Sequence, residues 1–344
     1  MRKSALEPKG ANLSRLRRAL LSWYDHNKRD LPWRRDANPY RVWVSEIMLQ
    51  QTRVAAVLQH YARFMQRFPT VQVLARARPS SVLAAWSGLG YYHRARRMHQ
   101  AAKVIVRKHQ GKFPQTAEEW RALPGIGRYT AAAIVSISFG EAIAALDGNV
   151  RRVLSRVFGH SEGTEVAWQR AETLLDRDRP GDFNQAMMEL GATVCTPRAP
   201  QCRNCPVSAW CKSQGPDESR PEAPRKRKQL YYALVRKGAS VLLVQRPADV
   251  SLMAGMWEFP EIPASRVNGS HPVASFRHSI TDTDYDVTIV AIPHEKLRSL
   301  QDNARWFARK GWERLPLTGL TRKVLRSSAV ASLARPQNLT QVSQ

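Results

Sequence analysis

The sequence predicts two domains of different class, an all-α domain followed by an α+β domain. Apolar residues recur at helical spacing from Leu13 onward, and strand signals are nearly absent as far as residue 212. Beyond residue 230, short β-like runs appear instead, the first two on either side of Lys237-Gly238. A chain of 344 residues is long enough to build two cores.

The first domain is predicted over residues 13–194 as a succession of helices. Leu13–Lys28 is the first helix, and Leu31-Pro32-Trp33-Arg34 interrupts the pattern. One long helix is expected over Trp43–Phe68. The later helices are predicted over Ser80–Trp86, His93–Lys108, Thr116–Ala122, Arg128–Phe139, Asn149–Phe158, Glu165–Leu175 and Phe183–Leu190.

Composition marks the remaining boundaries. Residues 1–12 are basic and aperiodic, which predicts disorder, and residues 336–344 are a tail. Residues 213–229 carry three prolines and end in Arg225-Lys226-Arg227-Lys228, a composition typical of an interdomain linker. The second domain is therefore predicted over residues 230–335, with further strands at Val273–Ile280 and Asp286–Ile292.

The charge of the chain indicates its partner. Fifty-four Lys and Arg against 28 Asp and Glu give a formal charge of +26. Such an excess favours a polyanion, most often nucleic acid, which is bound through counterion release. No apolar run reaches transmembrane length, and no signal-peptide core is visible. We therefore expect a soluble, cytoplasmic, nucleoid-associated protein of bacterial type, without a membrane partner.

A glycine turn between two helices is the first candidate for function. It runs from Leu123 to Gly127, where Pro124 ends one helix while Gly125 and Gly127 leave no Cβ between the turn and a ligand. The free N–H groups that begin the next helix could bind one phosphate. The turn alone is equally consistent with simple geometry, but Asp147 follows the same helix.

The four cysteines are the second candidate. They lie at positions separated by six, two and five residues: Cys195, Cys202, Cys205 and Cys211. Four cysteines in so short a segment, with prolines between them, indicate a metal-binding loop over residues 195–212. Four thiolates suit zinc or a 4Fe–4S cluster, and ligand chemistry alone slightly favours zinc. The loop also carries Arg198, Arg203 and Lys212, which suit a surface facing DNA.

Together, the glycine turn, Asp147 and the cysteine spacing resemble the helix-hairpin-helix DNA glycosylases that carry an iron–sulfur cluster. The resemblance implies one 4Fe–4S cluster on the four cysteines, with zinc as the alternative. Tyr129 stands where the endonuclease III branch has its Schiff-base lysine, and a phenol cannot form an imine. The MutY branch of adenine DNA glycosylases is favoured by four further segments: Leu31–Arg34, Val44–Thr52, Gly88–Tyr92 and Phe183–Cys195.

The resemblance implies roles for four residues. Glu46 is the general acid that protonates a flipped adenine and later activates water, so burial should raise its pKa. Asp147 stays ionised and stabilises the oxocarbenium-like sugar, with Tyr129 and Asn149 in support. On pattern alone, Glu46 is an exposed helix glutamate and Asp147 an N-cap.

Further residues match the DNA contacts of the family. Gln51 and Tyr91 match the positions that fill the gap and wedge the duplex when a base is flipped. The adenine pocket would be lined by Trp33, Arg34 and Gln185. The backbone phosphate would be held by Gly125, Gly127 and Arg128.

The second domain resembles a Nudix-like fold through Ser251–Pro260. No glutamate-rich helix follows Glu261 to hold Mg²⁺, so the implied role is recognition of 8-oxoguanine rather than hydrolysis. The family reads that base with Phe-Ser-His, for which this chain has Ile280-Thr281-Asp282. Thr281 keeps a hydroxyl, but Asp282 replaces the imidazole, which predicts weaker discrimination against guanine. Asp282, Asp284 and Asp286 are expected to sit poorly beside phosphates.

The sequence thus predicts a monomeric, monofunctional adenine DNA glycosylase of base-excision repair. Its substrate would be duplex DNA with adenine opposite 8-oxoguanine or guanine. An endonuclease III-like glycosylase/lyase acting on oxidised pyrimidines and a non-catalytic DNA-binding protein are the alternatives.

Overall fold

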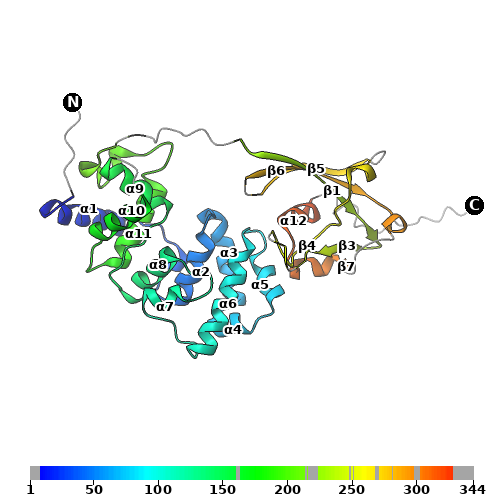
Figure 1. Ribbon diagram of the computed structural model, residues 1–344, viewed down its shortest axis with the longest axis horizontal. Helices are drawn as coiled ribbons and strands as arrows, with labels where there is room; N and C mark the ends of the chain where they lie inside the picture. Colours follow the sequence, from blue (N-terminus) through cyan, green and yellow to red (C-terminus); the bar gives the residue numbers. More distant parts are fainter. Residues whose placement is uncertain are drawn as a thin grey trace, which may run out of the picture. The chain divides into compact units, whose positions relative to one another are not determined.

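The computed structural model describes residues 8–159, 163–213, 215, 224–247, 249–250, 252–267, 271–280, 282–297 and 303–327. The chain divides into two compact units (Figure 1). The first combines Met1–Ala75 with Gln100–Pro221, and the second combines Arg76–His99 with Glu222–Gln344. Residues 76–99 belong to the predicted helical domain, whereas in the structure they group with the C-terminal unit.

The first unit is helical over its described residues. Its helices are α1 (Ala11–Asn27), α2 (Pro39–Leu49), α3 (Val54–Arg67), α4 (Val71–Arg76), α7 (Ala117–Arg121), α8 (Arg128–Phe139), α9 (Gly148–Phe158), α10 (Thr164–Leu174) and α11 (Pro180–Thr193), with the short helix η1 (Pro32–Arg34) after α1. The helix α6 (Tyr92–Lys108) begins in the second unit and continues into the first.

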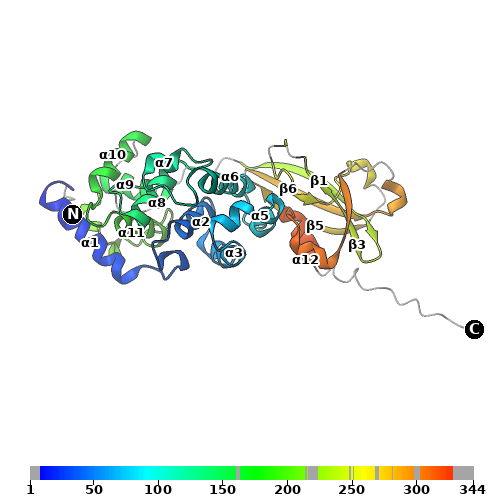
Figure 2. The ribbon, with the colours of Figure 1, turned by 90° about the horizontal axis from the view of Figure 1, so that it is seen from below.

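The core of this unit brings the candidate site together. Side chains of α1, α9, α10 and α11 form one buried cluster, and α1 lies alongside α11 (Figure 2). The centre of α8 is buried from Thr130 to Ser136 and packs against α2, α7 and α11. The site lies where α2, α8, α11 and the start of α9 meet.

The prediction of one long helix over Trp43–Phe68 is wrong, because the structure has two helices there. Helix α2 ends at Leu49 and α3 begins at Val54, and between them Gln51 adopts φ 55°. This left-handed backbone ends a right-handed helix and is uncommon for a residue other than glycine. The apolar periodicity continues on both sides of the break, so the pattern could not reveal it.

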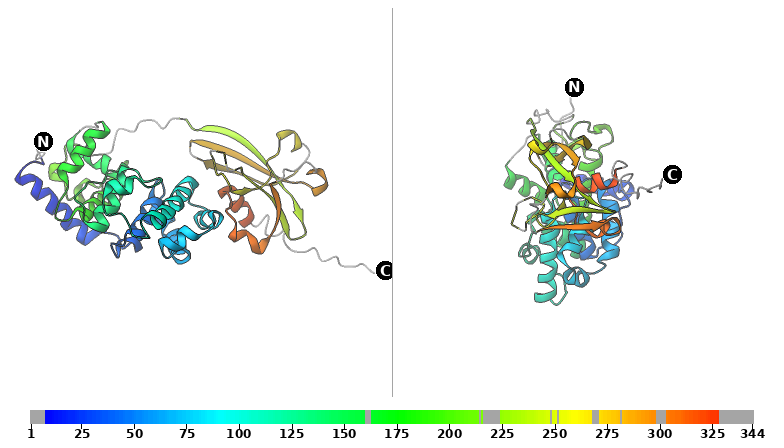
Figure 3. Two further views of the ribbon diagram at one scale, coloured as in Figure 1. Left: turned by 60° about the horizontal axis from the view of Figure 1, so that its bottom comes forward. Right: turned by 90° about the vertical axis from the view of Figure 1, so that its right-hand side faces the viewer.

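The second unit is α+β, as predicted. In its first sheet, β1 (Lys226–Leu234) pairs in parallel with β6 (Thr283–Ala291), which pairs antiparallel with β5 (Pro272–Ile280). The second sheet is antiparallel and contains β2 (Arg236–Lys237), β3 (Ser240–Gln245), β4 (Trp257–Glu258) and β7 (Ala304–Ala308). Helix α12 (Gly319–Arg326) packs beside the strands (Figure 3), and helix α5 (Pro79–Trp86) packs on η6 (Arg309–Arg314).

The basic end of the predicted linker is part of a strand. Strand β1 begins at Lys226, and its parallel pairing with β6 brings basic residues to the acidic row formed by Asp282, Asp284 and Asp286. The ion pairs are Arg225–Asp284 at 2.8 Å, Lys226–Asp282 at 3.3 Å and Arg227–Asp286 at 3.6 Å. Neighbouring cations therefore offset the charge of the three carboxylates, which the sequence predicts to sit poorly beside phosphates.

Among the described helices, none has the length and apolar character that a membrane span requires.

Candidate active site

Glu46 lies on α2 and is buried, with 5% of its surface exposed. Its Oε2 accepts a hydrogen bond of 2.6 Å from the Tyr129 hydroxyl. Burial raises the pKa of Glu46 to about 7; the Tyr129 hydrogen bond acts in the opposite direction, and Asp147 adds to the rise. The interpretation of Glu46 as an exposed glutamate is wrong, and its raised pKa suits a residue that donates a proton near neutral pH.

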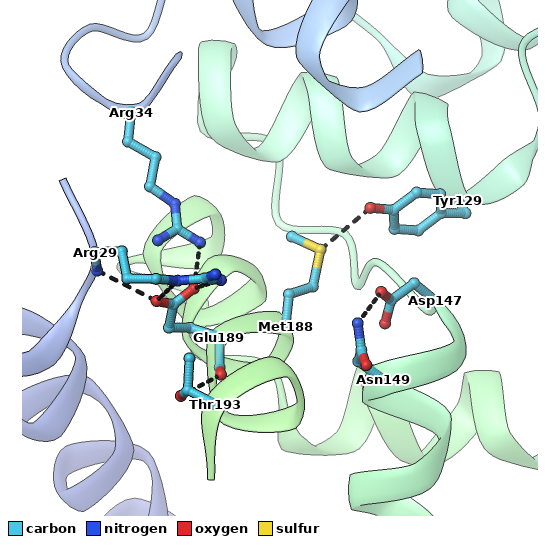
Figure 4. A network of polar contacts seen from close by, with 8 residues as sticks. All are labelled: Arg29, Arg34, Tyr129, Asp147, Asn149, Met188, Glu189 and Thr193. Carbon is cyan, nitrogen blue, oxygen red and sulfur yellow. Dashed lines mark hydrogen bonds and ion pairs between the residues drawn. The ribbon is translucent and has the colours of Figure 1, made fainter. Parts of the chain in front are cut away.

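Tyr129 sits in the first turn of α8 and contacts two other helices. Its hydroxyl donates to Glu46 on α2. The same hydroxyl lies 3.2 Å from Met188 Sδ on α11 (Figure 4). Burial raises the pKa of Tyr129 well above its usual value, and the Glu46 carboxyl adds to the effect. The phenol therefore remains a hydrogen-bond donor at physiological pH.

Asp147 is the N-cap of α9. Its Oδ1 accepts from the Val150 N–H at 2.7 Å, and its Oδ2 accepts from Asn149 Nδ2 at 3.1 Å. Burial raises the pKa of Asp147, while the hydrogen bonds from Val150 and Asn149 act against that rise. The capping role is compatible with the predicted catalytic role, because the same bonds that cap the helix stabilise the carboxylate.

A buried asparagine that sequence analysis missed holds the segment leading to Asp147. Asn184 on α11 accepts from the Ala145 N–H at 2.9 Å and donates to Ser136 Oγ and to the Ile143 carbonyl at the same distance. These bonds satisfy backbone groups of an irregular buried segment. Asn184 is a polar amide on an otherwise apolar face of α11, and this feature of the sequence could have indicated its role.

Arg152 connects the site to the cysteine loop (Cys195–Cys211). Its guanidinium donates to Asn149 Oδ1 at 2.8 Å, to the Gly191 carbonyl at 2.7 Å and to the Cys195 carbonyl at 2.9 Å. Gly191 lets α11 lie close to the start of α9, because a Cβ on residue 191 would lie 2.6 Å from the Asn149 Cβ. No motif in the sequence indicates a role for Arg152 or Gly191.

A buried carboxylate, Glu189, lies on α11 next to the predicted adenine-pocket residues. It accepts from Arg29 at 2.6 and 2.7 Å and from Arg34 at 2.9 Å (Figure 4). Burial alone would raise the pKa of Glu189, but the two guanidinium groups lower it. Among the described residues, Arg34 Nη1 is buried with no hydrogen-bond partner, so one donor remains for a ligand.

The other two predicted pocket residues lie on the same elements. Trp33 is buried in η1, edge-on to the Tyr61 ring at 5.2 Å between centroids. Gln185 lies on α11, about one turn before Glu189.

The predicted phosphate-binding residues form the turn between α7 and α8. Gly125 has φ 80°, which favours glycine, and a Cβ on Gly127 would meet nothing within 4 Å. The Arg128 guanidinium lies 4.1 Å from the centre of the Trp168 ring and pairs with Glu165 at 3.0 Å. The glycines therefore leave the N-terminus of α8 open to an anion.

Gln51 and Tyr91 share an unusual backbone conformation, each within its own unit. Their φ angles are 55° and 48°, in the left-handed region that costs free energy for a residue with a Cβ. Gln51 is exposed, and Tyr91 is half-buried with Arg94 5.3 Å from its ring centre.

Of the two residues predicted to read the base opposite adenine, Asp282 is exposed and paired with Lys226, whereas Thr281 lies outside the described residues.

The four cysteines are unpaired and half-buried, and they line one pocket with Arg156. Arg156 Nη1 lies 3.2 Å from Cys195 Sγ and donates to the Thr196 carbonyl at 2.9 Å. Within the described part of the chain, no three His, Cys, Asp or Glu side chains are grouped closely enough to ligate one metal ion. Burial raises the pKa of the Cys205 thiol to about 11.

Several known proteins are similar to this chain in sequence. The sequence profile of the HhH-GPD superfamily of base excision DNA repair proteins matches residues 44–175. The adenine DNA glycosylase of Homo sapiens is 41% identical over 318 residues, which cover 73% of this chain and 58% of that protein. The adenine DNA glycosylase of Arabidopsis thaliana is 40% identical over 300 residues, covering 72% and 47%. The chain thus spans roughly half of each relative's length.

Two solved structures resemble the helical part. A thermostable thymine-DNA glycosylase is 29% identical with a TM-score of 0.54, covering 58% of this chain and 95% of that one. An endonuclease III in a non-covalent DNA complex shares the fold, with 21% identity, a TM-score of 0.51 and the same coverage. The similarity to the HhH-GPD superfamily of base excision DNA repair proteins thus lies in residues 44–175 of this chain.

Proposed function

We propose that this protein is a monofunctional adenine DNA glycosylase that acts on adenine opposite 8-oxoguanine or guanine. The observation that carries the proposal is the buried Glu46 carboxyl, with a pKa near 7 and a 2.6 Å hydrogen bond from Tyr129. Asp147 supplies a second carboxyl at the N-terminus of α9. The similarity to adenine DNA glycosylases from Homo sapiens and Arabidopsis thaliana supports adenine as the base removed.

The two carboxyls divide the reaction between them. Protonated Glu46 gives its proton to the flipped adenine, and the electron pair of the C1′–N9 bond leaves with the base. The Asp147 carboxylate stabilises the positive sugar that remains. A water molecule then attacks C1′ and returns its proton to Glu46, which restores the starting state. Tyr129 orients Glu46, and Asn149 orients Asp147 through the hydrogen bonds described above.

The two rival functions are less well supported. A lyase needs an amine to form an imine with the sugar, and Tyr129 occupies the corresponding position. The guanidinium of Arg151 stays protonated and is no substitute. A purely DNA-binding protein has no use for a buried carboxyl whose pKa is raised to near neutrality.

We further propose that the cysteine loop holds one 4Fe–4S cluster. The resemblance of the cysteine spacing to that of the iron–sulfur glycosylases favours the cluster over zinc, which takes four sulfurs about 2.3 Å from a single ion. A 4Fe–4S cluster takes one thiolate for each iron and is wider. The Arg156 guanidinium beside Cys195 suits an anionic thiolate ligand. When bound, the cluster would cross-link four points of the loop. Iron and zinc analysis with visible absorbance distinguishes the two metals, since zinc gives a colourless protein.

The C-terminal unit would serve as a Nudix-like recognition module. Glu258 is held by Arg246 at 2.6 Å, so its carboxylate is engaged, and no glutamate-rich helix follows to bind Mg²⁺. Asp282 carries a negative charge where the family has an imidazole. We predict a smaller ratio of excision rates on 8-oxoguanine and guanine duplexes than a Phe-Ser-His enzyme shows when both are assayed together. An equal ratio of excision rates in the two enzymes would show that Asp282 does not weaken discrimination between 8-oxoguanine and guanine.

Single-turnover cleavage of duplexes with adenine opposite 8-oxoguanine, guanine or thymine tests the proposed function. The protein should release adenine, and strand scission should require alkali. Asp147→Asn should slow release by at least about a hundredfold, because the sugar loses its counter-charge. Asp178→Asn, which removes an exposed carboxylate of the same unit, should leave the rate unchanged. Direct nicking at oxidised pyrimidines would favour the lyase, and tight binding without cleavage would favour the binding protein.

A further inference from the structure

Two hydrogen bonds between described residues join the segment that carries Tyr91 to the C-terminal part of the second unit. Before Tyr91, the buried Ser87 hydroxyl donates to the Leu317 carbonyl at 2.6 Å. After it, Arg96 Nη1 donates to the Ala254 carbonyl at 2.7 Å. The two donors stand four residues before and five residues after Tyr91. Tyr91 thus lies in a short span with both ends held by the C-terminal part of the chain.

The span between the two attachments is itself well supported. The Trp86 Nε1–H donates to the Gly90 carbonyl at 3.1 Å, and the Gly88 N–H donates to the Tyr92 hydroxyl at 3.3 Å. The Arg94 guanidinium lies 5.4 Å from the centre of the Trp86 ring and 5.3 Å from that of Tyr91. The strained backbone of Tyr91 is therefore held in place by its surroundings.

Both acceptor carbonyls belong to backbone that is anchored around β4. Trp257 on β4 exchanges two backbone hydrogen bonds with the segment containing Leu317, donating to Pro316 at 2.8 Å and accepting from Thr318 at 3.0 Å. Ala254 precedes Gly255, whose N–H donates to the Arg246 carbonyl at 3.0 Å. A displacement of this backbone would therefore be passed through Ser87 and Arg96 to the span that carries Tyr91.

We propose that Ser87 and Arg96 are positioning residues that tie the placement of Tyr91 to the C-terminal part of the second unit. The C-terminal part of the chain, which recognises the base opposite adenine, then also fixes the position of Tyr91, the side chain that wedges the duplex. This inference rests on the proposed function, which gives Tyr91 the role of the wedge. Recognition of the partner base and extrusion of adenine are then coupled, since the residues for both belong to the second unit.

Single-turnover excision by the full-length protein tests the inference on two duplexes. One has adenine opposite 8-oxoguanine. The other has adenine opposite an abasic site, where no partner base needs to be recognised or stacked. Ser87→Ala and Arg96→Met should each slow excision about fivefold on the first duplex, the effect of losing one hydrogen bond, and leave the second unchanged. Ser87→Thr and Arg96→Lys keep a donor and should recover most of the rate.

Arg97→Met is the matched control, because Arg97 is an exposed arginine next to Arg96 on the same helix. It should not change the preference between the two duplexes, and an equal effect would show that Arg96 acts only through its charge. In a Tyr91→Ala background, Ser87→Ala should cost nothing further, since coupled residues are not additive.

Additive effects, or equal slowing on both duplexes with an unchanged melting temperature, would overturn the inference. If the unmodified protein released adenine from neither duplex, the proposed function itself would fail instead.

Discussion

The buried Glu46 and the half-buried Asp147 both lie in the candidate site, and their hydrogen bonds suit the two carboxyls to opposite protonation states. Glu46 accepts one bond from a phenol, whereas Asp147 accepts bonds from a backbone N–H and from an amide at the N-terminus of α9. Burial raises the pKa of both groups. The helix N-terminus and the two donors stabilise the charge of Asp147 more than the single phenol stabilises that of Glu46. Glu46 is thus suited to carry the proton and Asp147 the charge.

This difference predicts the pH dependence of adenine excision. Only protonated Glu46 can donate, so the single-turnover rate should fall as the pH rises through about 7. The Tyr129 hydrogen bond favours the ionised form of Glu46, so Tyr129→Phe should move this fall to higher pH. Tyr40→Phe removes a hydroxyl that donates to the Phe68 carbonyl at 2.7 Å and should leave the profile in place. A shift to lower pH in Tyr129→Phe would contradict the assignment.

At the scale of elements, helix α11 contacts several parts of the site, although its sequence contains no motif that predicts this. It carries Asn184, Met188 and Glu189, each of which contacts a different part of the site. Close packing of α11 on the start of α9 depends on Gly191, which lies against Asn149. The position of Asn149, and with it that of Asp147, therefore depends on this helix contact.

Gly191→Ala tests the contact between α11 and α9. The added Cβ would lie 2.6 Å from the Asn149 Cβ and 3.0 Å from its carbonyl oxygen, so one of the two helices must shift. We expect a loss of about 1–3 kcal/mol in the free energy of unfolding, measured by chemical denaturation, and slower adenine excision. Gly311→Ala, within η6, places a Cβ where nothing lies within 4 Å and should affect neither quantity. Full activity in Gly191→Ala would show that the contact does not position Asn149.

At the scale of the whole molecule, the charge of +26 should dominate DNA affinity. The acidic row lowers the positive charge locally, because Asp282, Asp284 and Asp286 pair with the basic residues at the start of β1. These surface pairs contribute little to stability, about 0–1 kcal/mol each. Their main effect is to keep Arg225, Lys226 and Arg227 beside carboxylates instead of phosphates.

Replacing the three aspartates of the acidic row by asparagine tests this effect. The salt dependence of duplex binding, followed by fluorescence anisotropy, should become steeper by up to about 0.9 in the logarithmic slope for each new phosphate contact. Affinity at low salt should rise accordingly. An unchanged slope would mean that the basic start of β1 does not reach the DNA. Asp178→Asn, in the other unit, serves as the charge control.

The sequence by itself determined the features that depend on neighbouring residues. Pro124, Gly125 and Gly127 specify the turn between α7 and α8, and Asp147 caps α9, because turn and cap chemistry acts within a few residues. The helical character of the first unit and the strands at β3 and β5 follow from apolar periodicity in the same way. The cysteine spacing also belongs here, since the four cysteines lie within one short loop.

Only the tertiary structure decided which distant groups meet. The Tyr129–Glu46 bond joins residues 83 apart in sequence, and the Arg29–Glu189 pair joins residues 160 apart. The break at Gln51, the burial of Glu46 and the pairing of β1 with the acidic row likewise left no local signal. Periodicity shows which face of a helix is apolar, but it does not show what that face packs against. The pKa of Glu46 follows from that packing, so the protonation state of the site was decided by the fold.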